Sequence, residues 1–231
     1  VSIFVNPRQF GANEDLDAYP RQLARDAALL ETEGVALLWA PAPDIVYPAG
    51  YATTISVAGV SEGLCGGDRP GHFDGVATVV CKLFNQVRPD MAFFGEKDWQ
   101  QLAVIRRMAR DLDLTLPHVD RIIGVPIVRE DDGLAMSSRN AYLSPAQRAR
   151  AAALPRLMRE TIARLIGGDP VENALRRLQK ELVEAGFDSV DYADLRRGAD
   201  LQTTREIGPD NRLFVAARIG GTRLIDNMPV V

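Results

Sequence analysis

The fold is restricted most by one stretch near the middle of the chain, residues 91–102, MAFFGEKDWQQL. It predicts a short buried strand over Met91–Phe94, a glycine turn, and a helix whose apolar residues recur at helical spacing as far as Leu112. Open α/β sheets place ligands where a strand ends at a helix N-terminus, because free N–H groups and the helix dipole meet there. Lys97 stands at that end, where the dipole disfavours a cation. A residue that opposes its local field indicates an anionic ligand.

The same residues also allow a purely structural interpretation. Asp98 followed three positions later by Gln101 is a capping-box pattern, in which each side chain bonds the other residue's backbone N–H. The local sequence leaves the capping and ligand-binding roles of Gln101 equally open, and an isolated exposed lysine is usually ordinary surface. Residues elsewhere in the chain are needed to choose between the structural and the ligand-binding interpretations.

Size and charge exclude several classes of protein. A length of 231 residues suffices for one or two domains with their own cores. A net charge of -4 argues against affinity for nucleic-acid phosphates, whereas a local basic pocket can still bind a small anion. Cys65 and Cys81 cannot form a disulfide framework, and no signal peptide or membrane-spanning apolar run is visible. We therefore expect a cytoplasmic protein with reduced thiols.

The first residues of the chain alternate between strand and helix patterns. Strands over Val1–Val5 and Ala36–Ala40 flank a helix over Pro20–Glu33, which predicts a right-handed crossover and a parallel sheet. The first strand stops at the Asn6-Pro pair, because proline cannot continue a central strand. Asn6 and Gln9 would then lie at its carboxyl end, where amides can bond a hydroxyl or carboxylate, although Asn-Pro is also a common turn start.

The most glycine-rich segment, Gly63–Phe73, precedes a helix predicted over Gly75–Val87. It matches neither the P-loop pattern nor the dinucleotide-binding fingerprint. It places Arg69 and His72 on a loop, where binding residues concentrate. A single histidine at a helix start is more often structural than functional. The arginine beside it makes a functional role less improbable.

A polar segment, Ser137-Ser138-Arg139, follows a strand predicted over Ile122–Val128. Two hydroxyls and an arginine in consecutive positions suit a phosphate group, since all three supply donors. An ordinary serine-rich linker between domains is the alternative, and the segment alone favours it. The next helix opens at Ser144 with a capping box and a proline at its first position.

The remaining residues predict a small α+β domain. We expect an arginine-rich helix over Pro145–Ile166 that is interrupted at Pro155, a helix from Val171 to Gly186, and strands that include a hairpin turning at Gly220-Gly221. The arginines are interleaved with acidic residues, as on a solvated face. We therefore place an N-terminal α/β domain at residues 1–127 and a C-terminal α+β domain at residues 128–231.

Four blocks, in this order, resemble the pantothenate synthetase (pantoate–β-alanine ligase) family: residues 4–10 (FVNPRQF), 69–73 (RPGHF), 94–101 (FGEKDWQQ) and 133–140 (GLAMSSRN). The resemblance covers essentially the whole chain, including RLIDN at 223–227. It implies a Rossmann-like parallel-sheet domain of the class I synthetase and nucleotidyltransferase type, with the smaller α+β domain closing over it, and a homodimer. It also implies ATP, Mg²⁺, pantoate and β-alanine as ligands.

This family activates pantoate with ATP to an enzyme-bound pantoyl adenylate and releases pyrophosphate. The β-alanine amine then attacks, which gives pantothenate and AMP. Attack of a carboxylate on the α-phosphate develops charge on phosphate oxygens, so we expect catalysis by cations and hydroxyls, without a protein nucleophile. We assign no protein ligand to a metal.

The resemblance gives a role to each residue that matches by position. Lys97, Ser137, Ser138 and Arg139 would be catalytic and would hold the phosphates. The nucleotide would further contact Gly95, Glu96, Asp98, Val128 and Met136, of which the last two would flank the adenine. Pantoate would contact Asn6, Gln9, His72 and Gln101.

One part of the family pattern is missing from this sequence. Just upstream of the segment that begins here, the family carries a strand and a His-x-Gly-His signature whose histidines bind ATP. This chain has only His72 and His118, neither lies in such a motif, and we assign His118 no role. We therefore expect this chain alone to have little or no adenylation activity. Pantoate-dependent ATP–pyrophosphate exchange at a normal rate would contradict that expectation.

Two other interpretations stay open. A different adenylate- or cytidylate-forming transferase on the same fold would bind nucleotide without stimulation by pantoate and β-alanine. A non-catalytic binding module would form no AMP even with the upstream segment restored. The ligase is favoured, because a module that had lost catalysis would not need all four sequence blocks. It requires that Gln9, Lys97 and Ser138 share one cavity.

Overall fold

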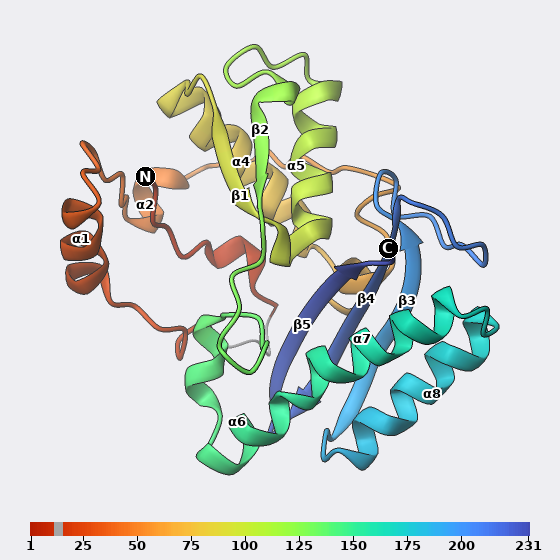
Figure 1. Ribbon diagram of the computed structural model, residues 1–231. Coiled ribbons are helices and arrows are strands. Elements are labelled where there is room, and N and C mark those ends of the chain that lie inside the picture. The colour runs from red at the N-terminus through yellow and green to blue at the C-terminus, as the bar shows by residue number, and fades with distance from the viewer. Residues whose placement is uncertain (12–15) are drawn as a thin grey trace.

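Two separate sheets organise the chain in the computed structural model, which describes residues 1–11 and 16–231 (Figure 1). The described elements are, in chain order, η1 (Pro7–Gln9), α1 (Leu23–Thr32), α2 (Pro43–Val46), α3 (Leu64–Asp68), α4 (His72–Val87), β1 (Ala92–Gly95), η2 (Glu96–Asp98), α5 (Trp99–Asp111), η3 (Val119–Arg121), β2 (Ile122–Val125), η4 (Ser138–Tyr142), α6 (Pro145–Ala151), α7 (Ala153–Ile166), α8 (Val171–Glu184), β3 (Ser189–Arg197), β4 (Asn211–Ile219) and β5 (Thr222–Pro229).

The first sheet is the parallel pair β1 and β2, joined through α5 as the central stretch predicts. Ala92 and Phe94 pack into a core with α4 and α5, whereas Phe93 between them is 60% exposed. Successive side chains of a strand point to opposite faces, so α4 and α5 cover one face of this pair. The prediction of a buried strand is therefore correct for one face only.

The N-terminal strands are much shorter than their apolar sequences predict. Val1–Val5 and Ala36–Ala40 meet in one parallel bridge between Ser2 and Trp39, with the Ile3 amide donating to the Trp39 carbonyl at 3.0 Å. The predicted direction is confirmed and the predicted extent is wrong. A pair of strands with so few ladder bonds is marginal by itself.

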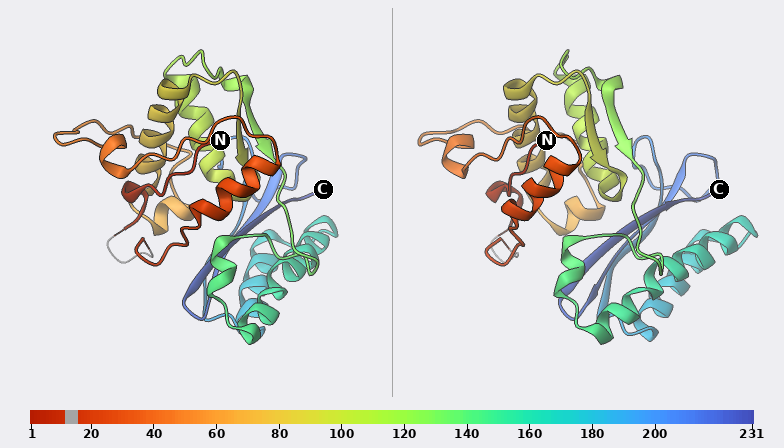
Figure 2. Two further views of the ribbon diagram at one scale, coloured as in Figure 1. Left: turned by 90° about the vertical axis from the view of Figure 1, so that its left-hand side faces the viewer. Right: turned by 60° about the vertical axis from the view of Figure 1, so that its left-hand side comes forward.

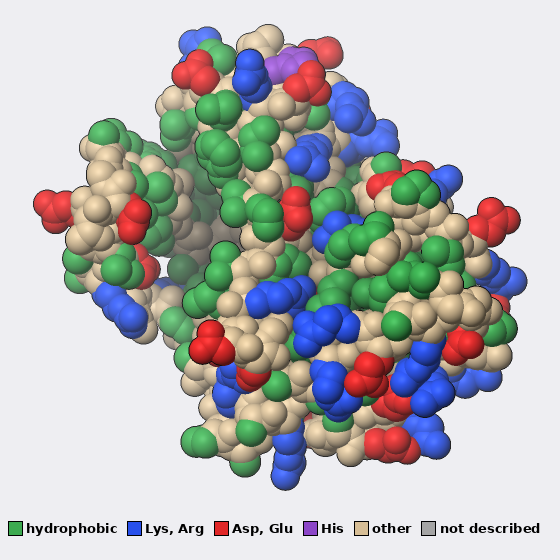
Figure 3. Space-filling model, in the orientation of Figure 1, with side chains coloured by type: hydrophobic (Ala, Val, Ile, Leu, Met, Phe, Trp, Pro, Cys, Tyr) green, Lys and Arg blue, Asp and Glu red, His purple; other side chains and the backbone are tan. Residues whose placement is uncertain are grey.

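Helix α1 forms where the helical spacing predicts it, and none of its residues is buried. Leu23, on the predicted apolar face, is 47% exposed. The helix stands apart from the other helices in Figure 1, and the space-filling view shows the surface hollowed between this part and the rest (Figure 3). The spacing of apolar residues therefore determines the helix but not its burial.

The second sheet has the antiparallel order β3-β4-β5, and α7 and α8 cover one of its faces (Figures 1 and 2). Gly220 and Gly221, both with positive φ, make the predicted hairpin turn. The arginine-rich helix is interrupted as predicted, but at Ala152, because Pro155 cannot bond to the carbonyl four residues earlier and clashes with it. The capping box of Ser144 and Gln147 is present.

The described residues form two apolar clusters. One joins α4, α5 and β1, and the other joins α6, α7 and α8 to the antiparallel sheet. Phe214 and Tyr192 extend from the second sheet into the first cluster, so the face of that sheet opposite α7 and α8 lies against the N-terminal half. The domain boundary at residues 127 and 128 stays a prediction. Among the described helices, none combines the length and apolar character that crossing a membrane needs.

Candidate active site

A cavity of about 590 Å³ lies between the two halves and is lined from both. That volume is within the range of small-molecule sites. Of the residues predicted to bind ligand, the following share its wall: Gln9, His72, Lys97, Asp98, Gln101, Ser137 and Arg139. Segments far apart in the sequence therefore face one space, which Gln9 and Lys97 share as the ligase interpretation requires. Ser138, the third residue that the interpretation places there, is not in the wall, although its neighbours Ser137 and Arg139 are.

The turn between β1 and α5 carries Lys97 and Gln101 into the cavity. Asp98 occupies the N-cap position of α5, but its side chain makes no capping hydrogen bond. Across the described residues, neither the Lys97 ammonium nor the Gln101 amide has a hydrogen-bond or ion-pair partner. The capping box is thus not formed, and the ligand-binding interpretation of Gln101 is favoured.

Asn6 lies behind the cavity wall, and its predicted contact with substrate stays a prediction. It is only 2% exposed and is the N-cap of η1. Its Oδ1 accepts from Tyr47 Oη at 2.9 Å, and its Nδ2 donates to Gln9 Oε1 at 2.8 Å and to the Gly75 carbonyl at 3.0 Å. Asn6 therefore orients the Gln9 amide so that its NH₂ group remains available to a ligand.

His72 and Arg69 hold the Gln9 segment from the other side. His72 Nδ1 lies 2.9 Å from the Gln9 carbonyl oxygen, and His72 Nε2 lies 3.1 Å from Arg69 Nη1. The neutral Nδ1–H tautomer satisfies both contacts, since it donates to the carbonyl and accepts from the guanidinium. Arg69 Nη2 also donates to the Gln9 carbonyl at 3.2 Å. His72 thus lines the cavity and at the same time supports Gln9.

The serine–arginine segment follows a hairpin and ends in a short helix. Ser137 is the N-cap of η4, and its Oγ accepts from the Arg139 amide at 3.3 Å. Ser138 Oγ donates to Tyr19 Oη at 3.3 Å, and the Arg139 guanidinium lies 5.6 Å from the centroid of the Tyr19 ring. Tyr19 therefore links the N-terminal half to the segment predicted to hold phosphates. The interpretation as a plain linker is not favoured, because Ser137 and Arg139 face the cavity.

Besides Ser138, four predicted nucleotide contacts lie outside the cavity wall. Val128 and Met136 are 62% and 55% exposed and are joined by a hydrogen bond from the Met136 amide to the Val128 carbonyl. They form part of the hairpin that leads into Ser137. Gly95 ends β1, and Glu96 opens the turn before Lys97. These four residues flank the site, and their contacts with nucleotide stay predictions.

Ion pairs hold the hairpin that precedes Ser137 in place. Arg148 bonds Glu130 and Asp132 at 2.5 and 2.6 Å, and these bonds lower the pKa of both carboxyl groups. Both groups therefore stay ionised at neutral pH and keep the hairpin attached to α6.

Sequence reasoning assigned no role to the residues that line the cavity from β3 and β5. Burial raises the pKa of Tyr192, whose hydroxyl lies 3.2 Å from Cys65 Sγ. Arg223 bonds Asp191 and Asp68 at 2.7 and 2.8 Å. The available signal was the occurrence of charged and amide side chains within an otherwise apolar strand, RLIDN. Polar side chains in a buried strand need hydrogen-bond or ion-pair partners, but the sequence does not identify which residues supply them.

Comparison with known proteins gives a consistent result. Residues 1–229 match the family model described as pantoate-β-alanine ligase. The pantothenate synthetase of Novosphingobium aromaticivorans is 72% identical, over 100% of this chain and 81% of its own length. The pantothenate synthetase crystal structure from Thermus thermophilus matches with a TM-score of 0.92 and 46% identity, over 99% of this chain and 82% of that one.

A third relative was solved with ligands. The pantoate–β-alanine ligase of Francisella tularensis, complexed with βγ-ATP and β-alanine, matches with a TM-score of 0.80 and 32% identity, over 99% of this chain and 78% of that one. The fold, the shared cavity and the similarity along the chain therefore agree. The chain belongs to the pantoate–β-alanine ligase family, and its function is that of a pantothenate synthetase.

Proposed function

We propose that the cavity binds ATP and pantoate together and promotes their reaction to pantoyl adenylate. A carboxylate oxygen of pantoate bonds to the α-phosphorus while the bond to the β-phosphate oxygen breaks, and pyrophosphate leaves. The β-alanine amine then bonds to the acyl carbon and loses a proton while AMP leaves. The observation that carries the proposal is the placement of Lys97 and Gln101, one helical turn apart, in one cavity wall without internal partners among the described residues.

The phosphate end of the cavity is assigned to Lys97, Ser137, Ser138 and Arg139. An ammonium, a guanidinium and hydroxyl donors oppose the negative charge that develops on phosphate oxygens during the attack. Lys97 is suited to this role because its local helix dipole disfavours the cation until an anion is present. Ser138 and Arg139 reach the site on a segment that contacts Tyr19, which supports a closed arrangement of the two halves.

The pantoate end is assigned to Gln9 and Gln101, two amides that can each donate to a carboxylate or hydroxyl oxygen. Asn6 and His72 position Gln9 through the hydrogen bonds described above. A site that presents two uncharged amides to one end and cations to the other orients a hydroxy acid with its carboxylate toward the phosphates. Such orientation accelerates the attack by holding the reacting groups in place.

The remaining proposed nucleotide contacts are those with the adenine and the ribose. Val128 and Met136 are proposed to flank the adenine, since their exposed apolar side chains belong to the hairpin that leads into Ser137. Gly95, Glu96 and Asp98 belong to the turn that carries Lys97, and we propose that Asp98 contacts the ribose.

The donor set fits a magnesium ion that is held chiefly by the nucleotide. The part of the chain that the structure describes has no cluster of three or more metal-ligating side chains. Asp68 and Asp226 in the cavity wall are paired with arginines, and Asp98 is assigned to the ribose, so the nucleotide phosphates and water would hold the ion. Magnesium commonly keeps several waters in sites that are built around substrate phosphates. Bound there, Mg²⁺ would neutralise phosphate charge.

A stable mimic of the intermediate tests this proposal without requiring turnover. A sulfamoyl analogue of pantoyl adenylate should bind about 100-fold more tightly than ATP, because it fills both ends of the cavity at once. Calorimetric competition should show displacement by ATP and by pantoate separately. An analogue that competes with ATP but not with pantoate would contradict the shared cavity. The homodimer implied by the family resemblance and the cytoplasmic location expected from the reduced thiols are also proposed; sedimentation velocity tests the dimer.

A further inference from the structure

We propose that Asn227, a buried residue of β5, is a positioning residue that fixes the Lys97 ammonium in the cavity. The inference rests on the proposed function, because it acts through the lysine assigned there to the phosphates. It extends that function to the C-terminal sheet, which would determine where the phosphate-binding cation lies.

The Asn227 side chain crosses from β5 to the turn that carries Lys97. Its Nδ2 donates to the carbonyl oxygens of Glu96 and Lys97 at 2.9 and 3.0 Å. Its Oδ1 accepts from Arg212 Nε at 2.9 Å. Asn227 is 2% exposed, so these bonds are shielded from water. The amide has one orientation, since exchanging its N and O atoms would place an oxygen against two carbonyls.

The same contact extends to the start of α5. The Arg212 guanidinium, held by Asn227, lies 3.7 Å from the centroid of the Trp99 ring. Trp99 Nε1 donates to the Gly198 carbonyl at 3.0 Å. The turn is therefore fixed to the antiparallel sheet both before and after Asp98. The Lys97 side chain of this turn remains directed into the cavity without a partner among the described residues.

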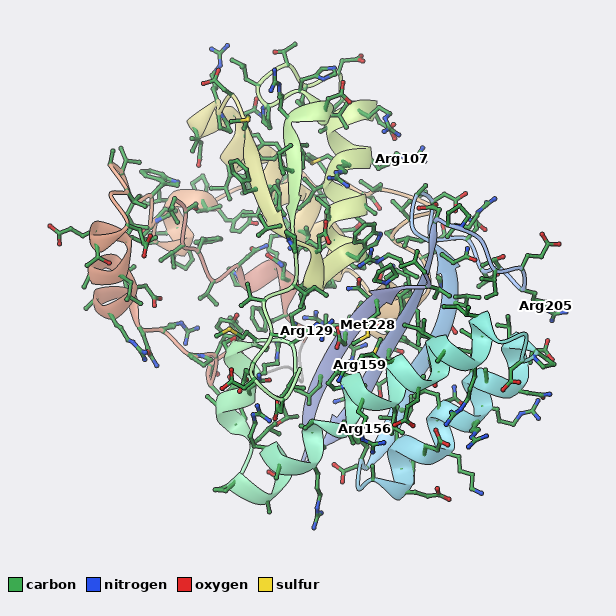
Figure 4. All side chains as sticks on the ribbon, viewed as in Figure 1. Arg107, Arg129, Arg156, Arg159, Arg205 and Met228 are labelled. Carbon is green, nitrogen blue, oxygen red and sulfur yellow. The ribbon has the colours of Figure 1, made fainter. Side chains whose placement is uncertain are left out.

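The neighbouring residue on β5 fixes the other phosphate-binding segment. Asp226 bonds both Nη atoms of Arg129, at 2.7 and 2.9 Å, and Arg129 Nη1 donates to the Gly133 carbonyl at 3.0 Å. Arg129 lies beside β5, near the labelled Met228 (Figure 4). Successive side chains of a strand point to opposite faces, so adjacent residues of β5 hold the Lys97 turn and the hairpin leading to Ser137. The spacing between these two segments is thereby set by one strand.

Asn227→Asp isolates the donors from the packing. The two side chains have nearly the same shape, and a carboxylate still accepts from Arg212 but cannot donate to the Glu96 and Lys97 carbonyls. Two partly buried carbonyl acceptors lose their donor and meet a negative oxygen instead. The turn should then leave its position, and ATP affinity should fall about tenfold.

Asn211→Ala is the matched control. Asn211 is also a buried asparagine of the same sheet, 4% exposed, and its Oδ1 accepts from the Gly208 amide at 2.6 Å. It does not line the cavity. This variant should lower the melting temperature as any buried hydrogen-bond loss does, and should leave ATP affinity unchanged.

Hydrogen exchange of the ligand-free protein tests the positioning directly. Asn227→Asp should speed exchange of the amides in residues 96–101 about tenfold relative to the wild type, with residues 174–184 of α8 unaffected, and Asn211→Ala should leave 96–101 unchanged. Unchanged exchange of 96–101 in Asn227→Asp would overturn the inference. This measurement needs no ligand, so a wild-type chain that fails to bind ATP would contradict the proposed function instead.

A double-mutant cycle shows whether Asn227 acts through Lys97. ATP affinity is measured by calorimetry for the wild type, Asn227→Asp, Lys97→Ala and the double variant. The Asn227 substitution should cost less than twofold once Lys97 is gone, because nothing remains for it to position. An equal tenfold loss in both backgrounds would assign Asn227 a merely structural effect and overturn the proposal.

Discussion

Two parts of the cavity wall, the turn that begins α5 and the strand β5, differ in how their polar side chains are used. In the N-terminal wall, the Lys97 ammonium and the Gln101 amide face the cavity without partners among the described residues. In the C-terminal wall, Arg223, Asp226 and Asn227 each bond two or more protein groups. A polar group that bonds within the protein contributes to stability, whereas one left toward a cavity is available to a ligand. The difference predicts which substitutions alter stability and which alter binding.

Asp226→Ala should give the largest effect and should act on stability. The Asp226 side chain is fully buried, and its removal leaves the partly buried Arg129 without its counter-ion. Breaking such a pair costs about 3 kcal/mol of unfolding free energy. Urea denaturation measures this, with Glu160→Ala, in an exposed pair with Arg156, as the control that should cost less than about 0.5 kcal/mol. Equal costs would contradict the stabilising role of the buried pair in the C-terminal wall.

Lys97→Ala should act in the opposite way. The unfolding free energy should change by less than about 0.5 kcal/mol, because no internal contact of the ammonium is lost. ATP binding should weaken about 30-fold, as expected for a hydrogen bond to a charged group. Calorimetry and thermal unfolding of the same samples decide the case, with Lys180→Ala as a charge-matched control. A large loss of stability with unchanged ATP binding would show that Lys97 is structural.

The adjacent residues Gln100 and Gln101 test the difference between bonded and available side chains within one helical turn. Gln100 is buried and bonds the Val60 and Gly63 carbonyls and the Cys65 amide, whereas Gln101 faces the cavity. Gln100→Ala should therefore destabilise the fold by about 2 kcal/mol. Gln101→Ala should preserve stability and weaken pantoate binding about fivefold. If Gln101→Ala instead cost about 1 kcal/mol of stability and left pantoate binding intact, a capping role would be established.

Lowering the pH should produce the smallest effect, which is a loss of the stability that the hairpin before Ser137 contributes. The bonds from Arg148 lower the pKa of Glu130 and Asp132 in the folded protein. A carboxyl whose folded pKa is depressed stabilises the fold above its unfolded pKa, and this contribution is lost as pH falls through the folded value. The melting temperature should therefore fall below about pH 4, the ordinary carboxyl range, more steeply in the wild type than in Arg148→Ala. Parallel pH curves would contradict this contribution.

The sequence predicted the elements better than it predicted their extent. The β1–α5–β2 unit, the hairpin at Gly220-Gly221 and the interrupted arginine-rich helix all form, because each depends on local periodicity and on the backbone limits of glycine and proline. The strands at the N-terminus shrink to one bridge, since a strand requires neighbours that its own residues do not specify.

The candidate site shows the same division. Gln9, Lys97, Gln101, Ser137 and Arg139 could be proposed from short motifs, because the chemistry of each side chain is a property of its residue type. The position of Asn6 behind Gln9 could not be predicted in this way, because its burial and bonding depend on Tyr47 and Gly75, which are distant in the sequence. Its contact with substrate stays a prediction.

The amino-acid sequence by itself therefore determined the kinds of element, their order, and the chemical groups available to a ligand. Only the tertiary structure decided which of those groups remain free to bind one. A side chain's residue type gives its donors and acceptors, but whether the protein uses them depends on neighbours that the fold brings together, as β5 does when Asn227 reaches the turn of Lys97.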